Sequence, residues 1–215
     1  MQYTDTYRSP LGNILLACDG ECLTGLWFEG QTYFASTLDP EHRAERLPIL
    51  AQIELWLDRY FAGEAPECLP PLRPHGTPFR LAVWAVLRQI PYGAVMTYGQ
   101  IASQLAQVRG LNTVSARAVG GAVGHNPISI LIPCHRVVGS QGSLTGYAGG
   151  LDRKLRLLTL EGARGPELRF FPALQTPVGA HLESGRPQVL SYANPPQHWP
   201  ARYSAACSAA RIPEL

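Results

Sequence analysis

A cysteine, a histidine and an arginine stand in succession at the end of an apolar run in "NPISILIPCHRVVGS", residues 126–140. A thiol reacts as its thiolate, and a nearby base or cation lowers the thiol pKa from about 8.5. His135 can accept the proton of Cys134, directly or through water, if a partner fixes the histidine tautomer. Arg136 adds positive field, and Glu161 is a candidate partner for the histidine. The trio therefore predicts a nucleophilic cysteine.

The apolar run at 128–132 predicts a strand that ends just before Cys134. A single cysteine in that position can also be a buried structural thiol, which is the alternative interpretation. The adjacent ionisable residues and the glycine-rich stretch "GSQGSLTGYAGG", residues 139–150, favour a reactive thiol instead. Cys18 and Cys22 are also close in sequence, but no paired Cys or His motif elsewhere completes a zinc site. We therefore expect no metal.

Charge is distributed unevenly along a chain whose formal net charge is only +2. Between Glu67 and Asp152 there are six arginines and neither a lysine nor an acidic residue, whereas the rest of the chain is net negative. A purely cationic segment favours a polyanionic partner, of which nucleic acid is the commonest. Six arginines over so long a stretch are ordinary in number, so charge alone is a modest indication.

The N-terminal part predicts an α+β domain made of an antiparallel sheet and a helix. Strands are expected at residues 3–9, 13–19 and 22–29, with Asp-Gly between the second and the third as a strong hairpin signal. Pro48 opens a helix whose apolar residues share one face, and Gly63 fits the end of that helix.

A second, mainly helical domain follows a stretch with five prolines, "APECLPPLRPHGTP", residues 65–78. Helical spacing is present over 79–89, and Thr97 can cap a further helix. A turn then leads to a helical segment at 113–126. Two short helices joined by a turn predict a helix-turn-helix.

The segment 113–126 has almost no side-chain bulk apart from Arg117. Each glycine inside a helix costs about 1 kcal/mol relative to alanine, so Gly120 and Gly121 need a reason. Tight packing against another helix and close approach of a ligand explain them about equally well. A smooth helix with one long arginine would, however, suit a narrow groove and a displaced base.

These patterns predict four regions: an N-terminal domain at 1–70, a linker at 71–77, a second domain at 78–165 and an irregular, proline-rich tail at 166–215. The polar start "MQYTDTYRSP" is unlike a secretory signal. Apolar runs fall short of the roughly 20 residues that cross a membrane. We therefore expect an intracellular protein without a membrane span.

Four motifs together resemble the O6-alkylguanine-DNA alkyltransferases, also called methylated-DNA–protein-cysteine methyltransferases. They are "IPYGAVMTYGQIA", "SARAVGGAVGHNP", "IPCHRVV" and "LEG". The resemblance is strong from Thr77 to Gly162 and looser before it, where "SPLG" is similar. It implies a ribonuclease H-like N-terminal domain followed by a winged helix-turn-helix-like domain. The tail has no counterpart in that family.

The resemblance implies single-turnover repair of DNA by direct reversal. The family moves alkyl groups from O6 of guanine, and less efficiently from O4 of thymine, to its own cysteine, which is Cys134 here. The implied partner is double-stranded DNA with alkylated bases, bound as a monomer through the minor groove with the damaged base flipped out. No cofactor is implied, and the compartment would be the cytoplasm, at the nucleoid of a bacterium or in the nucleus of a eukaryote.

The resemblance also assigns catalytic roles. His135 would act through a bound water as the base for Cys134, with Glu161 orienting it. Tyr98 would donate a proton or a hydrogen bond to N3 of the purine. Arg117 would take the place of the flipped nucleotide in the duplex.

Further binding roles follow from the same resemblance. Asn126 would brace the turn near the active-site strand, and Tyr147 would flank the base. The backbone at Cys134 and Val137 would read the guanine amine, while the amide of Ala148 would face O6. Arg136 and Gly149 complete the set expected to bind substrate or DNA.

Two other functions remain open from the residues alone. A lesion-flagging protein would keep the DNA-binding helix but lack the acceptor cysteine, whereas Cys134 is present. A Cys–His hydrolase would need Cys134 and His135 to face each other, which sequence neighbours seldom do.

Overall fold

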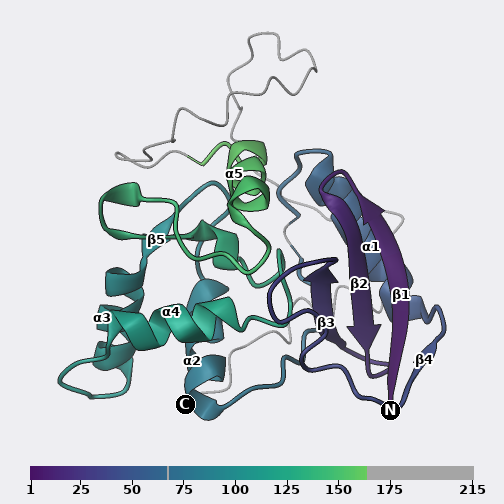
Figure 1. Ribbon diagram of the computed structural model, residues 1–215, viewed down its shortest axis with the longest axis horizontal. Helices are drawn as coiled ribbons and strands as arrows, with labels where there is room; N and C mark the ends of the chain where they lie inside the picture. Colours follow the sequence, from purple (N-terminus) through teal and green to yellow (C-terminus); the bar gives the residue numbers. More distant parts are fainter. Residues whose placement is uncertain (67, 164–215) are drawn as a thin grey trace, which may run out of the picture. The chain divides into compact units, whose positions relative to one another are not determined.

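The computed structural model describes residues 1–66 and 68–163, so the tail expected at 166–215 lies outside the described residues. Its N-terminal part contains a four-stranded sheet with strand order β3-β2-β1-β4 (Figure 1). The strands are β1 (Gln2–Ser9), β2 (Gly12–Cys18), β3 (Leu23–Phe28) and β4 (His42–Ala44).

The three longer strands form the expected antiparallel meander, but the sheet as a whole is mixed. β1 pairs with β2 and β2 with β3, both antiparallel. β4 was not predicted, and it pairs with β1 in parallel. All three residues of β4 are exposed, so it has no alternating apolar pattern by which the sequence could have revealed it. The wholly antiparallel sheet that the sequence predicts is therefore wrong at this edge.

Helix α1 (Pro48–Phe61) packs on the sheet, and contacts to β1, β2 and β3 join the two layers. Figure 1 shows this helix lying along the strands. Its buried residues recur at helical spacing, as the sequence predicts, and each fully buried large apolar side chain stabilises the fold by about 1.5–3 kcal/mol. They are Ile49, Leu50, Ile53, Trp56, Leu57 and Tyr60.

The C-terminal part is mainly helical, and side-chain caps fix where three of its helices begin. Thr77, Thr97 and Ser115 each accept a hydrogen bond from a backbone N–H in the first turn of the helix that follows. The elements are α2 (Pro78–Leu87), β5 (Met96–Thr97), α3 (Tyr98–Val108), α4 (Ala116–Gly124), β6 (Val137–Val138) and α5 (Leu151–Leu160).

Helices α2, α3 and α4 pack on one another, which gives the expected helix-turn-helix. The indole N–H of Trp84, on α2, donates to the carbonyl of Ala122 on α4 at 2.9 Å. β5 and β6 form a short parallel pair, with Met96 opposite Val137, so the start of α3 lies beside the segment that follows Cys134.

The apolar run at 128–132 is not a strand, contrary to the sequence-based interpretation. Ile130 has a φ of 69°, which breaks an extended conformation, and the amide of Ile132 closes a turn onto the carbonyl of Ile128. The run instead docks on β3, where Leu26 donates to Pro127 at 2.8 Å and accepts from Ser129 at 3.0 Å. The turn preceding Cys134 is thereby attached to the N-terminal sheet.

The proline-rich stretch also attaches to β3. Leu23 donates to the carbonyl of Pro71 and accepts from the amide of Arg73, both at 2.8 Å. One continuous cluster of buried apolar residues includes side chains of both the sheet part and the helical part. Within the described ranges no helix is both long and apolar enough for a membrane crossing.

Candidate active site

Cys134 opens a short 3-10 turn, η1 (Cys134–Arg136), and only 3% of its surface is exposed. The side-chain amide of Asn126 donates to its Sγ at 3.0 Å. The same nitrogen donates to the carbonyls of Ile132 at 2.8 Å and Ile128 at 3.2 Å. Asn126 therefore ties the turn together and places one polar hydrogen on the sulfur.

The structure holds the Cys134 thiol in its neutral form. Burial raises the pKa of this thiol, and its interactions with Asn126, with Lys154 and with nearby backbone N–H groups lower the pKa but do not outweigh burial. The sequence predicts a thiol with a lowered pKa beside a histidine and an arginine. The pKa is raised instead, because Arg136 bonds to Glu161 and the sulfur is buried away from water.

His135 and Glu161 form a fully buried pair, with 2.7 Å between Nε2 and Oε1. Burial lowers the pKa of His135, so the imidazole is neutral. Burial also acts to raise the pKa of Glu161, but interactions with His135 and Arg136 outweigh it and bring that pKa to about 2.

An ionised carboxylate beside a neutral imidazole fixes the tautomer. Nε2 of His135 must carry the proton, because the Glu161 carboxylate only accepts hydrogen bonds. Nδ1 of His135 is then an unprotonated base. It is buried, and no group in the described part of the chain hydrogen-bonds to it. A proton acceptor is thus available on the residue next to the thiol.

Glu161 lies just past the end of α5 and has further partners. Arg136 donates to it through Nε at 2.8 Å and Nη2 at 3.0 Å, and Tyr60 donates from α1 at 2.6 Å. Nη1 of Arg136 donates to the carbonyl of Ile90 at 2.6 Å, and its guanidinium lies 5.7 Å from the Tyr92 ring centre. The structure therefore places Arg136 at the carboxylate, where it compensates the buried charge.

Tyr98 and the loop at 145–150 lie next to this buried centre. The Tyr98 hydroxyl donates to the carbonyls of Thr145 at 3.2 Å and Gly146 at 3.1 Å. Burial, with a smaller contribution from Cys134, raises the pKa of Tyr98 to about 12, so it is a neutral donor. The pKa of Tyr147 is likewise raised, by burial first and by Cys134 second.

Ala148 and Gly149 are held by the N-terminal part and by local packing. The carbonyl of Ala148 accepts from the amide of Thr32 at 2.9 Å. A Cβ at position 149 would lie 2.5 Å from the Tyr147 ring, so the loop requires glycine there. Three of the residues expected near the base, Tyr147, Ala148 and Gly149, are thus held in one loop, whereas Cys134 and Val137 lie in η1 and β6.

Lys154 belongs to the centre, although no motif in the sequence marks it as a site residue. It is fully buried on α5, and its ammonium donates to Val137 at 2.5 Å and to Thr145 at 2.7 Å. Burial lowers its pKa to about 8, against an opposing effect of Cys134. The available signal was composition, because Lys154 is the only lysine in the sequence.

Arg117 is exposed in the first turn of α4, and its neighbours leave the helix surface open. A Cβ at Gly121 would meet nothing within 4 Å, and one at Gly120 would make ordinary contact with the Tyr98 ring at 3.8 Å. Tight helix packing therefore does not require these glycines. Approach of an external backbone remains as the reason for them.

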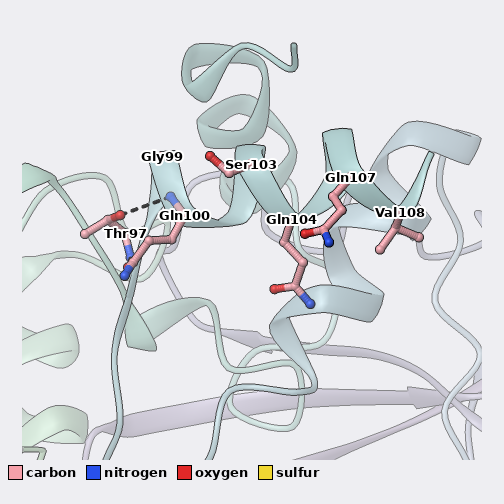
Figure 2. Close-up of a pocket in the computed structure, with 7 residues that line it drawn as sticks. All are labelled: Thr97, Gly99, Gln100, Ser103, Gln104, Gln107 and Val108. Atoms are coloured by element: carbon pink, nitrogen blue, oxygen red, sulfur yellow. Dashed lines mark hydrogen bonds between the residues drawn. The ribbon is translucent and has the colours of Figure 1, made fainter. Parts of the chain in front are cut away.

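A hollow of about 1000 Å³ runs along α3 (Figure 2). Its lining side chains are uncharged and include no thiol and no base that could activate a hydroxyl, so we do not place the reaction there. They are Thr97, Gly99, Gln100, Ser103, Gln104, Gln107 and Val108. In residues 1–66 and 68–163, no three His, Cys, Asp or Glu residues gather in a way that could hold a metal ion.

Two family models match the chain. One, described as the ribonuclease-like domain of 6-O-methylguanine DNA methyltransferase, matches residues 2–73. The other, the DNA binding domain of 6-O-methylguanine DNA methyltransferase, matches residues 78–163. Together with the sheet and helices described above, these matches confirm the fold class expected from the sequence.

Named relatives are similar over most of their length. A methylated-DNA–protein-cysteine methyltransferase of Haemophilus influenzae is 43% identical over 179 residues, covering 79% of this chain and 95% of the relative. One of Mycobacterium tuberculosis is 44% identical, covering 75% and 93%. The crystal structure of the M. tuberculosis O6-methylguanine methyltransferase has a TM-score of 0.65 at 42% identity, covering 77% of this chain and 96% of that one. A crystal structure of the M. tuberculosis protein in complex with DNA also has a TM-score of 0.65, at 41% identity, covering 76% and 95%.

Replacing the buried carboxylate tests the charge balance of the site. We expect Glu161→Gln to lower the free energy of unfolding at pH 7 by about 3–5 kcal/mol, because it leaves Arg136 buried without its anion. The pKa of Glu161 is about 2 in the folded chain and about 4.3 in an unfolded one. Its stabilising effect is therefore complete above the unfolded pKa and is lost as the pH falls from about 4.3 towards 2.

Urea unfolding at several pH values measures both effects. The loss of stability between pH 5 and pH 2 should be shallower in Glu161→Gln than in the wild type. Glu64→Gln is the control, because Glu64 forms an exposed pair with Arg59 and should change stability by less than about 1 kcal/mol. Equal effects of the two substitutions would contradict the assigned role of Glu161.

The single lysine permits a direct titration. Lysine labelled with ¹³C at Cε should give one signal, which titrates near pH 8 in the folded protein and near the ordinary value of about 10.4 in urea. A midpoint of about 10 in the folded protein would show that the ammonium is not desolvated.

Proposed function

The chain belongs to the 6-O-methylguanine DNA methyltransferase family, and we propose that Cys134 is the residue to which it transfers the alkyl group. The protein repairs DNA by direct reversal: the alkyl group leaves O6 of guanine and becomes bonded to a cysteine of the protein itself. The observation that carries the assignment to Cys134 is its setting. The sulfur is held by Asn126, and the next residue is a buried, neutral histidine oriented by the ionised Glu161.

The first step is removal of the thiol proton. Nδ1 of His135 takes the proton of Cys134, through a water, when the substrate base is bound. Glu161 stabilises the imidazolium that forms, because it accepts the Nε2–H bond at 2.7 Å. Arg136 and Tyr60 act on the carboxylate, so they are positioning residues in this scheme.

Transfer then proceeds by displacement at the alkyl carbon. The bond from Sγ of Cys134 to that carbon forms as the bond from the carbon to O6 breaks, and the electron pair remains on the guanine. Tyr98 turns its hydroxyl hydrogen from the Thr145 and Gly146 carbonyls to N3 and thereby stabilises the departing base; it keeps that hydrogen because its pKa is raised to about 12. The product is an S-alkylcysteine, and no step restores the thiol, so each molecule reacts once.

A neutral resting thiol suits a nucleophile that is used once. Thiols that are largely ionised and exposed react with oxidants and electrophiles, whereas a buried, protonated thiol is inert. Because 3% of Cys134 is exposed, an incoming base must open a path to the sulfur.

DNA is the partner, and helix α4 presents the surface for it. Its face is open at Gly121, and Arg117 projects from its first turn. We assign this face to the minor groove and Arg117 to the space of the extruded nucleotide, whose unstacking costs a few kcal/mol. The protein acts on alkylated guanine, and on alkylated thymine less efficiently, as a monomer. Its compartment is the one that holds the DNA: the cytoplasm of a bacterium or the nucleus of a eukaryote.

The competing functions fit the site less well. In a Cys–His hydrolase the histidine would bond to the thiol, but no hydrogen bond within the described residues joins Sγ of Cys134 to the His135 ring. The sulfur instead accepts a hydrogen bond from the side-chain amide of Asn126. A protein that only flags lesions would have no use for an acceptor thiol with a base beside it.

Mass spectrometry of the intact protein tests the reaction class. After incubation with duplex DNA containing O6-methylguanine, we expect the mass of the protein to rise by one methyl group and no more, even with excess DNA. Peptide mapping should place that methyl on Cys134, and Cys134→Ser should gain nothing. Methyl on any other residue, or repeated turnover per molecule, would refute the proposal.

The role of Arg117 can be separated from a general charge effect. We expect Arg117→Ala to slow repair of duplex DNA much more than reaction with the free modified base, because extrusion is needed only in the duplex. Arg88→Ala is the control, since Arg88 is exposed and belongs to the same basic segment. Equal losses on the two substrates would argue against an extrusion role, as would equal losses in the two variants.

A further inference from the structure

The guanidinium of Arg153 joins three segments that are far apart in the sequence. Its Nε donates to the carbonyl of Leu11 at 3.0 Å, Nη1 to Gly149 at 3.1 Å and Nη2 to Glu29 at 3.1 Å. Leu11 lies in the turn between β1 and β2, Glu29 follows β3, and Gly149 belongs to the loop before α5. One side chain therefore ties the N-terminal sheet to the loop that carries Tyr147 and Ala148.

The surroundings of Arg153 are shaped to the planar guanidinium. Its central carbon lies 4.9 Å from the centre of the buried Phe28 ring. Gly12 has a φ of 105°, and a Cβ there would lie 3.3 Å from Nη2. Three carbonyls in three directions match the fixed fork of an arginine, whereas a lysine has a single nitrogen at the end of a flexible stem.

Two planar peptide groups, joined by a hydrogen bond, connect the carbonyl held by Arg153 to the N–H of Ala148. A peptide group is planar, so fixing the carbonyl of Gly149 also fixes the N–H of Gly150. That N–H donates to the carbonyl of Tyr147 at 3.0 Å. The Tyr147 carbonyl shares its plane with the N–H of Ala148. Arg153 therefore determines the direction of the Ala148 N–H without contacting it.

Three further carbonyls of the loop are also paired, which holds the loop on both sides of Tyr147. Thr145 accepts from Lys154 and Tyr98, Gly146 accepts from Tyr98, and Ala148 accepts from Thr32. In the described part of the chain the N–H of Ala148 donates no backbone hydrogen bond. A backbone donor that is held in place and has no acceptor of its own within these residues is suited to an oxygen that gains negative charge.

We propose that Arg153 is a positioning residue for the alkyl transfer: by anchoring Gly149 to the N-terminal sheet, it aims the Ala148 N–H at O6 of the bound guanine. This inference rests on the proposed function, because it needs O6 to be the oxygen that becomes negative. It gives the N-terminal sheet a part in the reaction itself. The contribution is made in the transition state, so it affects the transfer rate rather than DNA affinity.

Single-turnover kinetics with protein in excess over duplex DNA containing O6-methylguanine separates these quantities. The plateau rate reports transfer, and the protein concentration at half the plateau reports binding. Arg153→Met keeps the length of the side chain and removes its donors. We expect its plateau rate to fall about 10-fold to 100-fold, with the half-saturating concentration and its salt dependence unchanged.

Two controls separate positioning from general damage. Arg156→Met removes the same charge from the same helix, where Arg156 pairs with Asp152 on the surface, and should keep the wild-type plateau. Alkylation of Cys134 by iodoacetamide should be as fast in Arg153→Met as in the wild type, because Arg153 does not contact the sulfur. A parallel loss of iodoacetamide reactivity would indicate disruption of the site and overturn the proposal.

Arg153→Lys makes the test independent of the folding of the methionine variant. Lysine keeps the charge but cannot reach three carbonyls at once, so we expect a plateau rate well below that of the wild type. A wild-type plateau in Arg153→Lys, or in a folded Arg153→Met, would overturn the inference. So would a higher half-saturating concentration at an unchanged plateau, which would indicate a phosphate contact. Failure of the wild type to transfer methyl would instead refute the proposed function.

Discussion

The structure depends on keeping one carboxylate ionised in the interior. Moving Glu161 out of water costs several kcal/mol, and that cost is offset only where every lone pair has a donor. Arg136, Tyr60 and His135 supply those donors from the turn η1 and from α1. Once the carboxylate is ionised, the tautomer of the histidine follows, and with it the position of the free base. Glu161 thus affects the chemistry of the thiol through His135, without contacting the sulfur itself.

Burial shifts the pKa values of Cys134 and Lys154 in opposite directions, and both shifts favour the neutral form. The interior disfavours both a thiolate and an ammonium, so the thiol pKa rises and the lysine pKa falls to about 8. Each charge, when present, stabilises the other. In the proposed reaction, a thiolate formed at Cys134 therefore meets the ammonium of Lys154, which is already anchored on the Val137 and Thr145 carbonyls. Protection of the resting thiol and activation of the reacting one come from the same arrangement.

Local signals in the sequence predicted the elements, and long-range contacts decided the rest. Helix α1 follows from Pro48 and its apolar spacing, and α3 follows from the Thr97 cap. The Pro-Cys-His-Arg motif led to Cys134 as the proposed nucleophile. The contact of Tyr60 with the site could not be predicted from the sequence, because its partner Glu161 is 101 residues further along the chain. The apolar run was misread as a strand because a left-handed Ile130 leaves no trace in hydrophobic periodicity.

Neither half of the described chain contains the whole site, and this follows from the geometry of the buried centre. Tyr60 reaches Glu161 from α1, Thr32 holds Ala148 from the end of the sheet, and β3 holds the turn before Cys134 through Leu26. The cysteine, the histidine and α4 belong to the C-terminal half, but some of the groups that hold them in place do not. A site that must hold a neutral thiol, a fixed tautomer and an aimed backbone amide needs rigid support on several sides. The N-terminal sheet supplies part of that support, so under the proposed function its packing against the helical part contributes to the reaction.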